Sequence, residues 1–196
     1  MLVLLDTCVY LRLAKRIRPF LGVQFGHKNY ILAILSIVEK EVLRSQRLKF
    51  QNPWFEDDVF GEERDSHAMR MTQLEKQSVQ HAKSVFDGYV QQNLDDFMDE
   101  GRSPPGGADR ELLAIAYVRQ AIVVTDDLGI HLLASEFKLP IWHGYELLSK
   151  LLAAKIVDGE LIREIYSALE ANLDITSTWE QAKHTTFKKV FGKSKT

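Results

Sequence analysis

Acidic side chains stand beside the apolar runs of this sequence, where buried strands are expected to end and helices to begin. These residues are Asp6, Glu41, Asp109, Asp126 and Asp127. Carboxylates a few ångströms apart in a partly desolvated cleft repel one another, so a cluster of them requires cations or protons. Oxygen ligands without histidine or cysteine favour a hard ion, Mg²⁺ or Mn²⁺. Two such ions can align a phosphodiester, activate water and stabilise the leaving oxygen, so the chemistry expected here is metal-dependent hydrolysis.

The apolar runs predict the strands of a parallel sheet. Residues 2–5, 30–35, 121–125 and 139–142 are short and apolar, as strands buried on both faces are. Helical patterns separate them, so we predict an α/β fold with a parallel sheet flanked by helices. Ligands bind beyond the carboxyl ends of such strands. Asp6 and Asp127 follow strands, and Glu41 and Asp109 lie early in neighbouring helices, so all four are expected at one edge of the sheet.

Two segments lie outside this alternation. Residues 50–101 contain a cluster of acids and the pattern of a long polar helix over about 69–97, which we interpret as a helical insertion. Residues 155–196 predict further helices. We therefore expect a domain over 1–154, with the insertion at about 50–101, and a C-terminal helical extension over 155–196. Trp54, Phe55 and Phe60 in the insertion either stack unpaired bases or pack the insertion onto the domain.

Composition narrows the function classes. The 196 residues carry a net charge of −2, which argues against sequence-blind packaging of nucleic acid but allows a local basic patch. Such a patch is expected from Arg12, Lys15, Arg16 and Lys28. The single cysteine, Cys8, excludes an internal disulfide framework and indicates the cytoplasm. Every apolar run is too short for a membrane span, and the first has its basic residues behind it, unlike a secretory signal.

The acidic motifs resemble, in order, the four acidic motifs of PIN-domain nucleases, which include the VapC-like ribonucleases. They are LLDT at 4–7, IVEKEV at 37–42, AD at 108–109 with LLAIA at 112–116, and VVTDD at 123–127. The likeness covers roughly residues 1–49 and 102–154. It implies a flavodoxin-like PIN fold, a Mg²⁺- or Mn²⁺-dependent endoribonuclease that cleaves single-stranded or structured RNA by two-metal-ion hydrolysis, a homodimer, and, in bacteria, a toxin restrained by an antitoxin protein.

The resemblance also assigns roles to individual residues. It implies catalytic roles for Asp6, Glu41, Asp109 and Asp127. Metal ligands would be Asp6, Asp109 and Asp127, with Asp126 as the outer choice. Thr7 and Thr125 would support them with their hydroxyl groups.

Other interpretations of these residues remain open. Asp6, Asp109 and Asp127 each precede or open a helix, so each could serve only as a helix cap. The same fold class includes phosphatases and receiver domains, but a phosphatase of the dehalogenase type has Asp-x-Asp on its first strand, where this chain has Asp6-Thr7-Cys8. A receiver domain has a phosphorylatable aspartate after a middle strand, and no residue of this sequence can be assigned to that position. The remaining alternative is a catalytically silent PIN-like module that binds RNA or protein.

The second motif contains two glutamates, Glu39 and Glu41. They are separated by about 200° around a helix and cannot share one site. Ser36 followed three residues later by Glu39 is a capping-box pattern, which predicts that Glu39 reaches back to the Ser36 amide. Glu41 is therefore the expected ligand.

Overall fold

The computed structural model describes residues 1–98 and 102–192; the expected end of the insertion, near residue 101, lies outside them. The described residues contain a five-stranded sheet in the order β2-β3-β1-β4-β5. Its strands are β1 (Leu2–Leu5), β2 (Gln24–Phe25), β3 (Tyr30–Ile34), β4 (Ile122–Val124) and β5 (Ile141–Trp142). All neighbours pair in parallel except β2, which is antiparallel to β3. The predicted α/β fold with a parallel sheet is confirmed.

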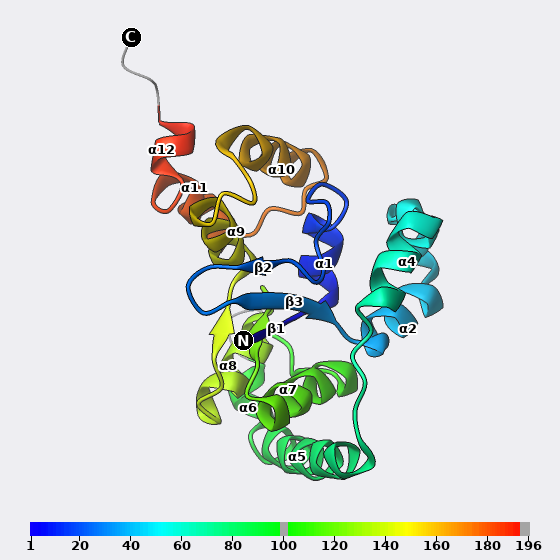
Figure 1. Ribbon diagram of the computed structural model, residues 1–196. Coiled ribbons are helices and arrows are strands. Elements are labelled where there is room, and N and C mark those ends of the chain that lie inside the picture. The colour runs from blue at the N-terminus through cyan, green and yellow to red at the C-terminus, as the bar shows by residue number, and fades with distance from the viewer. Residues whose placement is uncertain (99–101, 193–196) are drawn as a thin grey trace.

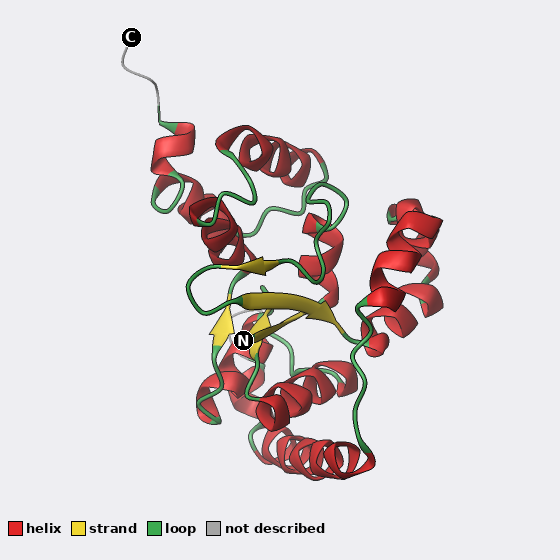
Figure 2. Cartoon of the chain, in the orientation of Figure 1, coloured by secondary structure: helices red, strands yellow, loops and turns green. Residues whose placement is uncertain are grey.

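Helices flank the sheet on both faces (Figures 1 and 2). Above it in Figure 1 lie α1 (Thr7–Leu13), α9 (Gly144–Ala153), α10 (Gly159–Ala171), α11 (Ser177–His184) and α12 (Lys188–Phe191). Below it lie α5 (Gln73–Gln92), α6 (Leu94–Phe97), α7 (Gly107–Arg119) and α8 (Leu128–Glu136). To the right, α2 (Ser36–Arg44), α3 (Gln46–Gln51), the 3₁₀ helix η1 (Pro53–Glu56) and α4 (Asp58–Ser66) form a lobe, called here the α2–α4 lobe.

The central strand β1 contributes side chains to two hydrophobic cores. Val3 and Leu5 belong to the core shared with α1, α9 and α10, whereas Leu4 belongs to the core shared with α7 and α8. Successive side chains of a strand point to opposite faces, so a strand between two helical layers must be apolar throughout. This explains why the run shows no alternation. The two-residue strand β2 was not predicted, because it is too short to give a periodic pattern.

The insertion is part of the fold rather than a projecting arm. Its long helix α5 begins with a capping box between Thr72 and Glu75 and packs along α7. Phe86 and Val90 on the inner face of α5 are only 2% and 3% exposed. The expected polar helix is therefore present, and its few apolar side chains complete the core that β1 shares with α7 and α8.

The aromatic residues of the insertion are used for packing. Trp54, Phe55 and Phe60 are buried, and the rings of Trp54 and Phe55 contact Tyr10 of α1. The interpretation that they stack unpaired bases is therefore wrong, because their rings are enclosed by the fold. Glu63 of α4 also accepts hydrogen bonds from the backbone amides of Phe20 and Leu21, both at 2.6 Å, which ties the lobe to the loop after α1.

The C-terminal helices contribute to the core that β1 shares with α1 and α9. Tyr166, Trp179 and Phe187 are at most 1% exposed, and α10 packs against α1. Among the described residues, no helix has the length and apolarity needed to cross a membrane.

Phe86→Ala should lower the free energy of unfolding by about 3–5 kcal/mol, because it leaves a cavity between α5 and α7. Val85 is the neighbouring residue in the same helix but is 57% exposed, so Val85→Ala should change stability by no more than about 0.5 kcal/mol. Urea unfolding of both variants measures this. Equal, small effects would show that α5 does not form part of the core.

Candidate active site at the carboxyl edge of the sheet

Asp6 lies at the centre of the carboxyl edge. Its backbone amide donates to Val124 of β4, which continues the pairing of β1 by one residue. The residue is 8% exposed, and both carboxylate oxygens are engaged: Oδ1 accepts from the Thr7 amide at 2.6 Å and Oδ2 from the Thr125 hydroxyl at 2.9 Å. Asp6 is thus the N-cap of α1 and also joins the ends of two strands.

Glu41 faces the same edge from α2. Its Oε2 accepts a hydrogen bond from the Thr7 hydroxyl at 2.6 Å, so α2 is joined to the start of α1 directly beside Asp6. Thr7 and Thr125, the expected supporting residues, therefore each hold one carboxylate of the predicted set.

Asp109 and Asp127 reach the edge from two further helices. Asp109 lies in the first turn of α7, and its Oδ2 accepts from the Gly106 amide at 2.7 Å. Asp127 is the N-cap of α8, and its Oδ1 accepts from the Ile130 amide at 3.0 Å. Helix capping therefore does occur at these acids, but it uses only one carboxylate oxygen of each. Among the described residues, no donor contacts the second oxygen of Asp109 or Asp127, or Oε1 of Glu41.

The acids are close enough to perturb one another. Burial and the negative charges of Asp109 and Glu41 raise the pKa of Asp6 to about 7. The hydrogen bonds from Thr125 and Thr7 act in the opposite direction but are outweighed. Burial also raises the pKa of Asp109, and the charges of Asp127 and Glu41 act in the same direction. The ionised cluster is therefore electrostatically unfavourable without a counter-ion.

The donor chemistry fits a hard divalent cation, although the side chains do not form a closed cage. Within residues 1–98 and 102–192, no three acidic, histidine or cysteine side chains converge closely enough to enclose a metal ion. Mg²⁺ is typically held by one or two carboxylates, with water and substrate phosphate completing its shell. An open edge with uncommitted oxygens on Asp109, Asp127 and Glu41 suits that kind of binding.

Asp126 points away from this group and has a structural task. Its carboxylate accepts from Arg12 at 2.6 Å, from the Trp179 indole at 2.8 Å and from the Gly144 amide at 3.0 Å. A Cβ at Gly144 would lie 2.8 Å from the Trp179 ring, so the close contact requires glycine. Burial would raise the pKa of Asp126. The hydrogen bonds from His143, Gly144 and Trp179, together with the charge of Arg12, outweigh burial and lower this pKa. The structure therefore does not bring Asp126 to the other acids as an outer ligand.

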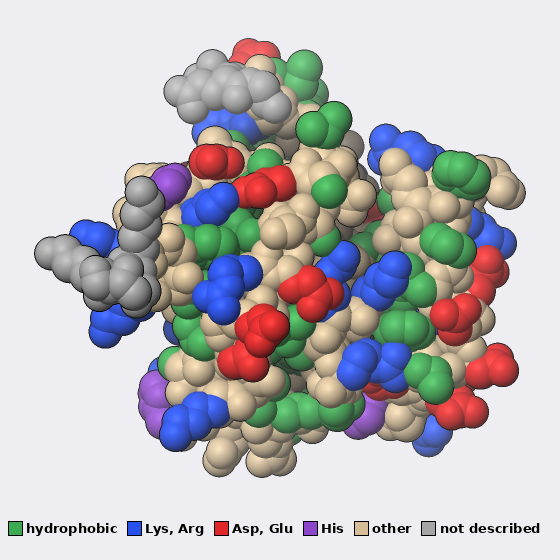
Figure 3. Space-filling model, turned by 90° about the horizontal axis from the view of Figure 1, so that it is seen from above, with side chains coloured by type: hydrophobic (Ala, Val, Ile, Leu, Met, Phe, Trp, Pro, Cys, Tyr) green, Lys and Arg blue, Asp and Glu red, His purple; other side chains and the backbone are tan. Residues whose placement is uncertain are grey.

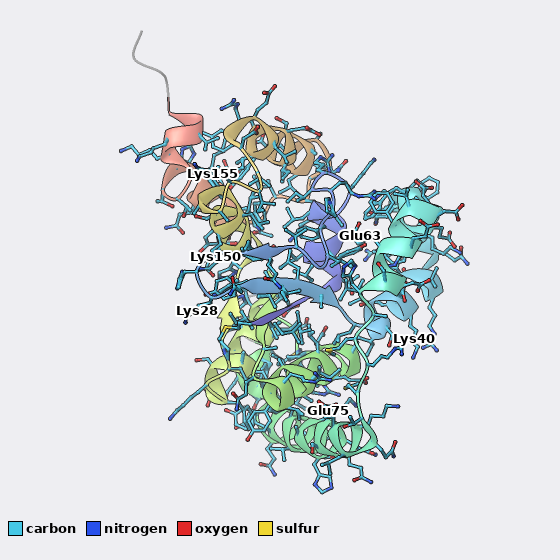
Figure 4. The ribbon with its side chains drawn as sticks, in the orientation of Figure 1. Lys28, Lys40, Glu63, Glu75, Lys150 and Lys155 are labelled. Atoms are coloured by element: carbon cyan, nitrogen blue, oxygen red, sulfur yellow. The ribbon has the colours of Figure 1, made fainter. Side chains whose placement is uncertain are left out.

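The expected basic patch is divided by the fold. Arg12 is occupied by ion pairs with Asp126 and Asp174, and Arg16 lies 3.5 Å from Glu164. Lys15 is exposed just after the last turn of α1. Lys28, in contrast, lies in the turn before β3, where its carbonyl oxygen accepts from the N-terminal amino group. Figure 4 shows Lys28 and Lys40 at opposite ends of β3, so Lys28 is at the wrong edge of the sheet to guide a phosphate to the acids.

The expected cap at Ser36 is wrong, whereas the separation of the two glutamates is as predicted. Helix α2 has Leu35 as its N-cap, and no side chain caps it. Glu39 instead accepts from the Arg64 guanidinium of α4 at 2.6 Å, on a different side of α2 from the Thr7–Glu41 contact. Sequence reasoning missed this pair, and also Asp174 and Trp179, because each partner comes from a segment outside the acidic motifs.

Comparison with known proteins adds two solved structures. Neither a protein-family model nor a curated protein sequence matches the chain. A chain in the structure of VapBC-1 from nontypeable Haemophilus influenzae is 15% identical, with a TM-score of 0.47, over 74% of this chain and 99% of that chain. A chain in the structure of VapBC2 from Rickettsia felis, bound to a DNA fragment from their promoter, is 18% identical, with a TM-score of 0.43, over 73% and 98%.

The site predicts that Asp6→Asn stabilises the metal-free protein at alkaline pH. Because the pKa of Asp6 is raised on folding, its ionisation lowers the free energy of unfolding progressively from about pH 4 to pH 7, by an amount on the order of a few kcal/mol. An asparagine side chain at this position carries no such charge. In chelator, the variant should therefore melt above the wild type at pH 8, and the difference should shrink at pH 5.

Asp126→Asn is the matched control for this prediction. The pKa of Asp126 is lowered on folding, so its charge stabilises the protein above about pH 4, and the substitution should lower the melting temperature at pH 8. If both substitutions shift melting in the same direction, the carboxyl edge does not carry the repulsion described here.

Proposed function

We propose that this protein is a metal-dependent endoribonuclease of the PIN type. The observation that carries the proposal is the gathering of Asp6, Glu41, Asp109 and Asp127, from four different elements, at the carboxyl edge of a parallel sheet. Their repulsion is relieved by a divalent cation, and three of them retain an uncommitted oxygen. Mg²⁺ or Mn²⁺ bound there supplies Lewis-acid activation of the phosphodiester and of water.

The residues around the acids prepare the site for this reaction. The Thr125 hydroxyl and the Thr7 amide hold the Asp6 carboxylate in one orientation, which limits the reorganisation needed when an ion binds. The Thr7 hydroxyl fixes Glu41 beside it. Asp109 and Asp127 are held by backbone amides in the first turns of their helices. Each acid is therefore positioned by rigid elements before substrate arrives.

The purified protein should cleave single-stranded RNA in the presence of Mn²⁺ or Mg²⁺ and stop in excess chelator. Asp109→Asn should abolish cleavage with little effect on folding, because Asp109 is partly exposed. Gel analysis of a labelled RNA measures the products. Full activity in chelator, or full activity of Asp109→Asn, would contradict a metal-dependent reaction at this edge.

Metal binding has its own readout. Millimolar Mn²⁺ should raise the melting temperature of the wild type. An ion at one hundred times its Kd adds about 2.7 kcal/mol to the free energy of unfolding. The melting temperature of Asp109→Asn should rise less. A metal-dependent shift without cleavage would instead identify the catalytically silent binding module.

Glu41→Gln and Glu39→Gln should separate catalysis from stability. Glu41→Gln should remove most cleavage and barely change melting, because the amide oxygen can still accept from Thr7. Glu39→Gln should retain cleavage but lower stability by about 1–3 kcal/mol, since buried Arg64 loses its charged partner. Cleavage rates and urea unfolding of the two variants check this, and the reverse pattern would mean that the wrong glutamate has been assigned to the site.

A further inference from the structure

A groove of about 610 Å³ opens beside the acidic edge, between α1, α3 and α10. Its polar walls include Cys8, Arg12, Lys15, Arg16, Arg47 and Asp174. We refer to it as the α1–α10 groove. One wall belongs to the segment after Asp6, one to the α2–α4 lobe and one to the C-terminal helices. Two of the three walls therefore lie at or beyond the limits of the region that resembles PIN-domain nucleases.

The groove is basic although the chain as a whole carries a net charge of −2. Four cationic side chains line it, against the single carboxylate of Asp174. Arg12 and Arg16 have acidic partners, as described above. Lys15 and Arg47 are exposed, and neither has an ion-pair or hydrogen-bond partner within the described part of the chain. Figure 3 shows Lys and Arg side chains gathered along the seam between the body of the molecule and the α2–α4 lobe.

The groove leads to the acids. Cys8, an exposed residue that lines it, is two residues beyond Asp6 on α1. Cys8, Arg12, Lys15 and Arg16 line the groove along α1 and the turn that follows it. Helix α1 begins at Thr7, whose hydroxyl donates to Glu41. A chain-like anion lying along Arg47 and Lys15 would therefore continue to the carboxyl edge.

We propose that the α1–α10 groove binds the backbone of a single-stranded polynucleotide next to the bond presented to the acids. This inference rests on the proposed nuclease function. Lys15 and Arg47 each contact a phosphate, and the exposed amides of Gln51 and Asn172 face the bases or sugars. The volume is that of a small-molecule site and accommodates a short piece of one strand but not a duplex. Binding is therefore electrostatic along the backbone and tolerant of sequence.

Salt dependence of binding tests the two contacts directly. Anisotropy of a labelled oligouridine is measured with the full-length protein in chelator, so that no cleavage is needed. For a single strand, each phosphate contact contributes about −0.7 to the slope of log K against log salt concentration. Lys15→Gln and Arg47→Gln should each reduce the magnitude of the slope by about 0.7, and the double variant by about 1.4.

Lys28→Gln is the control, since Lys28 is an exposed lysine at the opposite edge of the sheet, and it should leave the slope unchanged. If the slope falls by the same amount with oligothymidine, the backbone phosphates are the ligand. If the slope falls only with RNA, the 2′-hydroxyl groups are also recognised. Both outcomes support the groove. A duplex of the same length should compete less well than the single strand.

An unchanged slope in the double variant overturns the proposal, as does an equal loss in Lys28→Gln or equal competition by the duplex. Melting temperatures within about 1 °C of the wild type for all variants exclude misfolding as the cause, because surface substitutions of this kind change stability little. Failure of the groove and failure of the nuclease are separable. Cleavage that depends on Asp109 but not on Lys15 and Arg47 rejects only the groove, while salt-sensitive binding without cleavage rejects only the nuclease.

Discussion

The burial of one carboxylate, Asp6, is the constraint on which the carboxyl edge depends. A nearly inaccessible acid must either keep its proton or have its charge balanced. Two donors from the ends of β1 and β4 balance its charge in part, and the negative charges of Asp109 and Glu41 oppose it. The edge is therefore held in an arrangement that its own charges disfavour, and the two hydrophobic cores supply the stability that maintains it. Such a local conflict with stability is typical of functional sites.

Asp126 and Asp127 are adjacent in the chain but have opposite environments. The side chain of Asp126 turns inward, where a guanidinium, an indole and a backbone amide neutralise it. Asp127 turns outward, caps α8 and keeps one oxygen without a protein donor among the described residues. Both residues lie in the short connection between β4 and α8. One peptide bond thus separates Asp126, which binds residues of α1, α9 and α11, from Asp127, an exposed acid of the carboxyl edge.

Sequence reasoning could find the features that depend on local pattern. The parallel strands, the positions of Asp6 and Asp127 after them, and the difference in direction between Glu39 and Glu41 follow from periodicity and from the geometry of helices and sheets. Features that depend on distant partners could not be found. The pairing of Glu39 with Arg64, the ion pairs of Arg12 and the burial of Trp54 each need a second segment whose position no local pattern gives. Lys28 was misplaced because the hairpin that carries it contains a strand of only two residues.

The hydrogen bond between Asp126 and Trp179 links residues that are 53 positions apart. Synthesis proceeds from the N-terminus, so every acid of the edge leaves the ribosome before the indole that anchors Asp126 is made. Until then the Asp126 carboxylate has Arg12, His143 and Gly144 beside it but lacks the indole of Trp179. The order of the chain therefore delays the complete set of hydrogen bonds to Asp126 until α11 has been made.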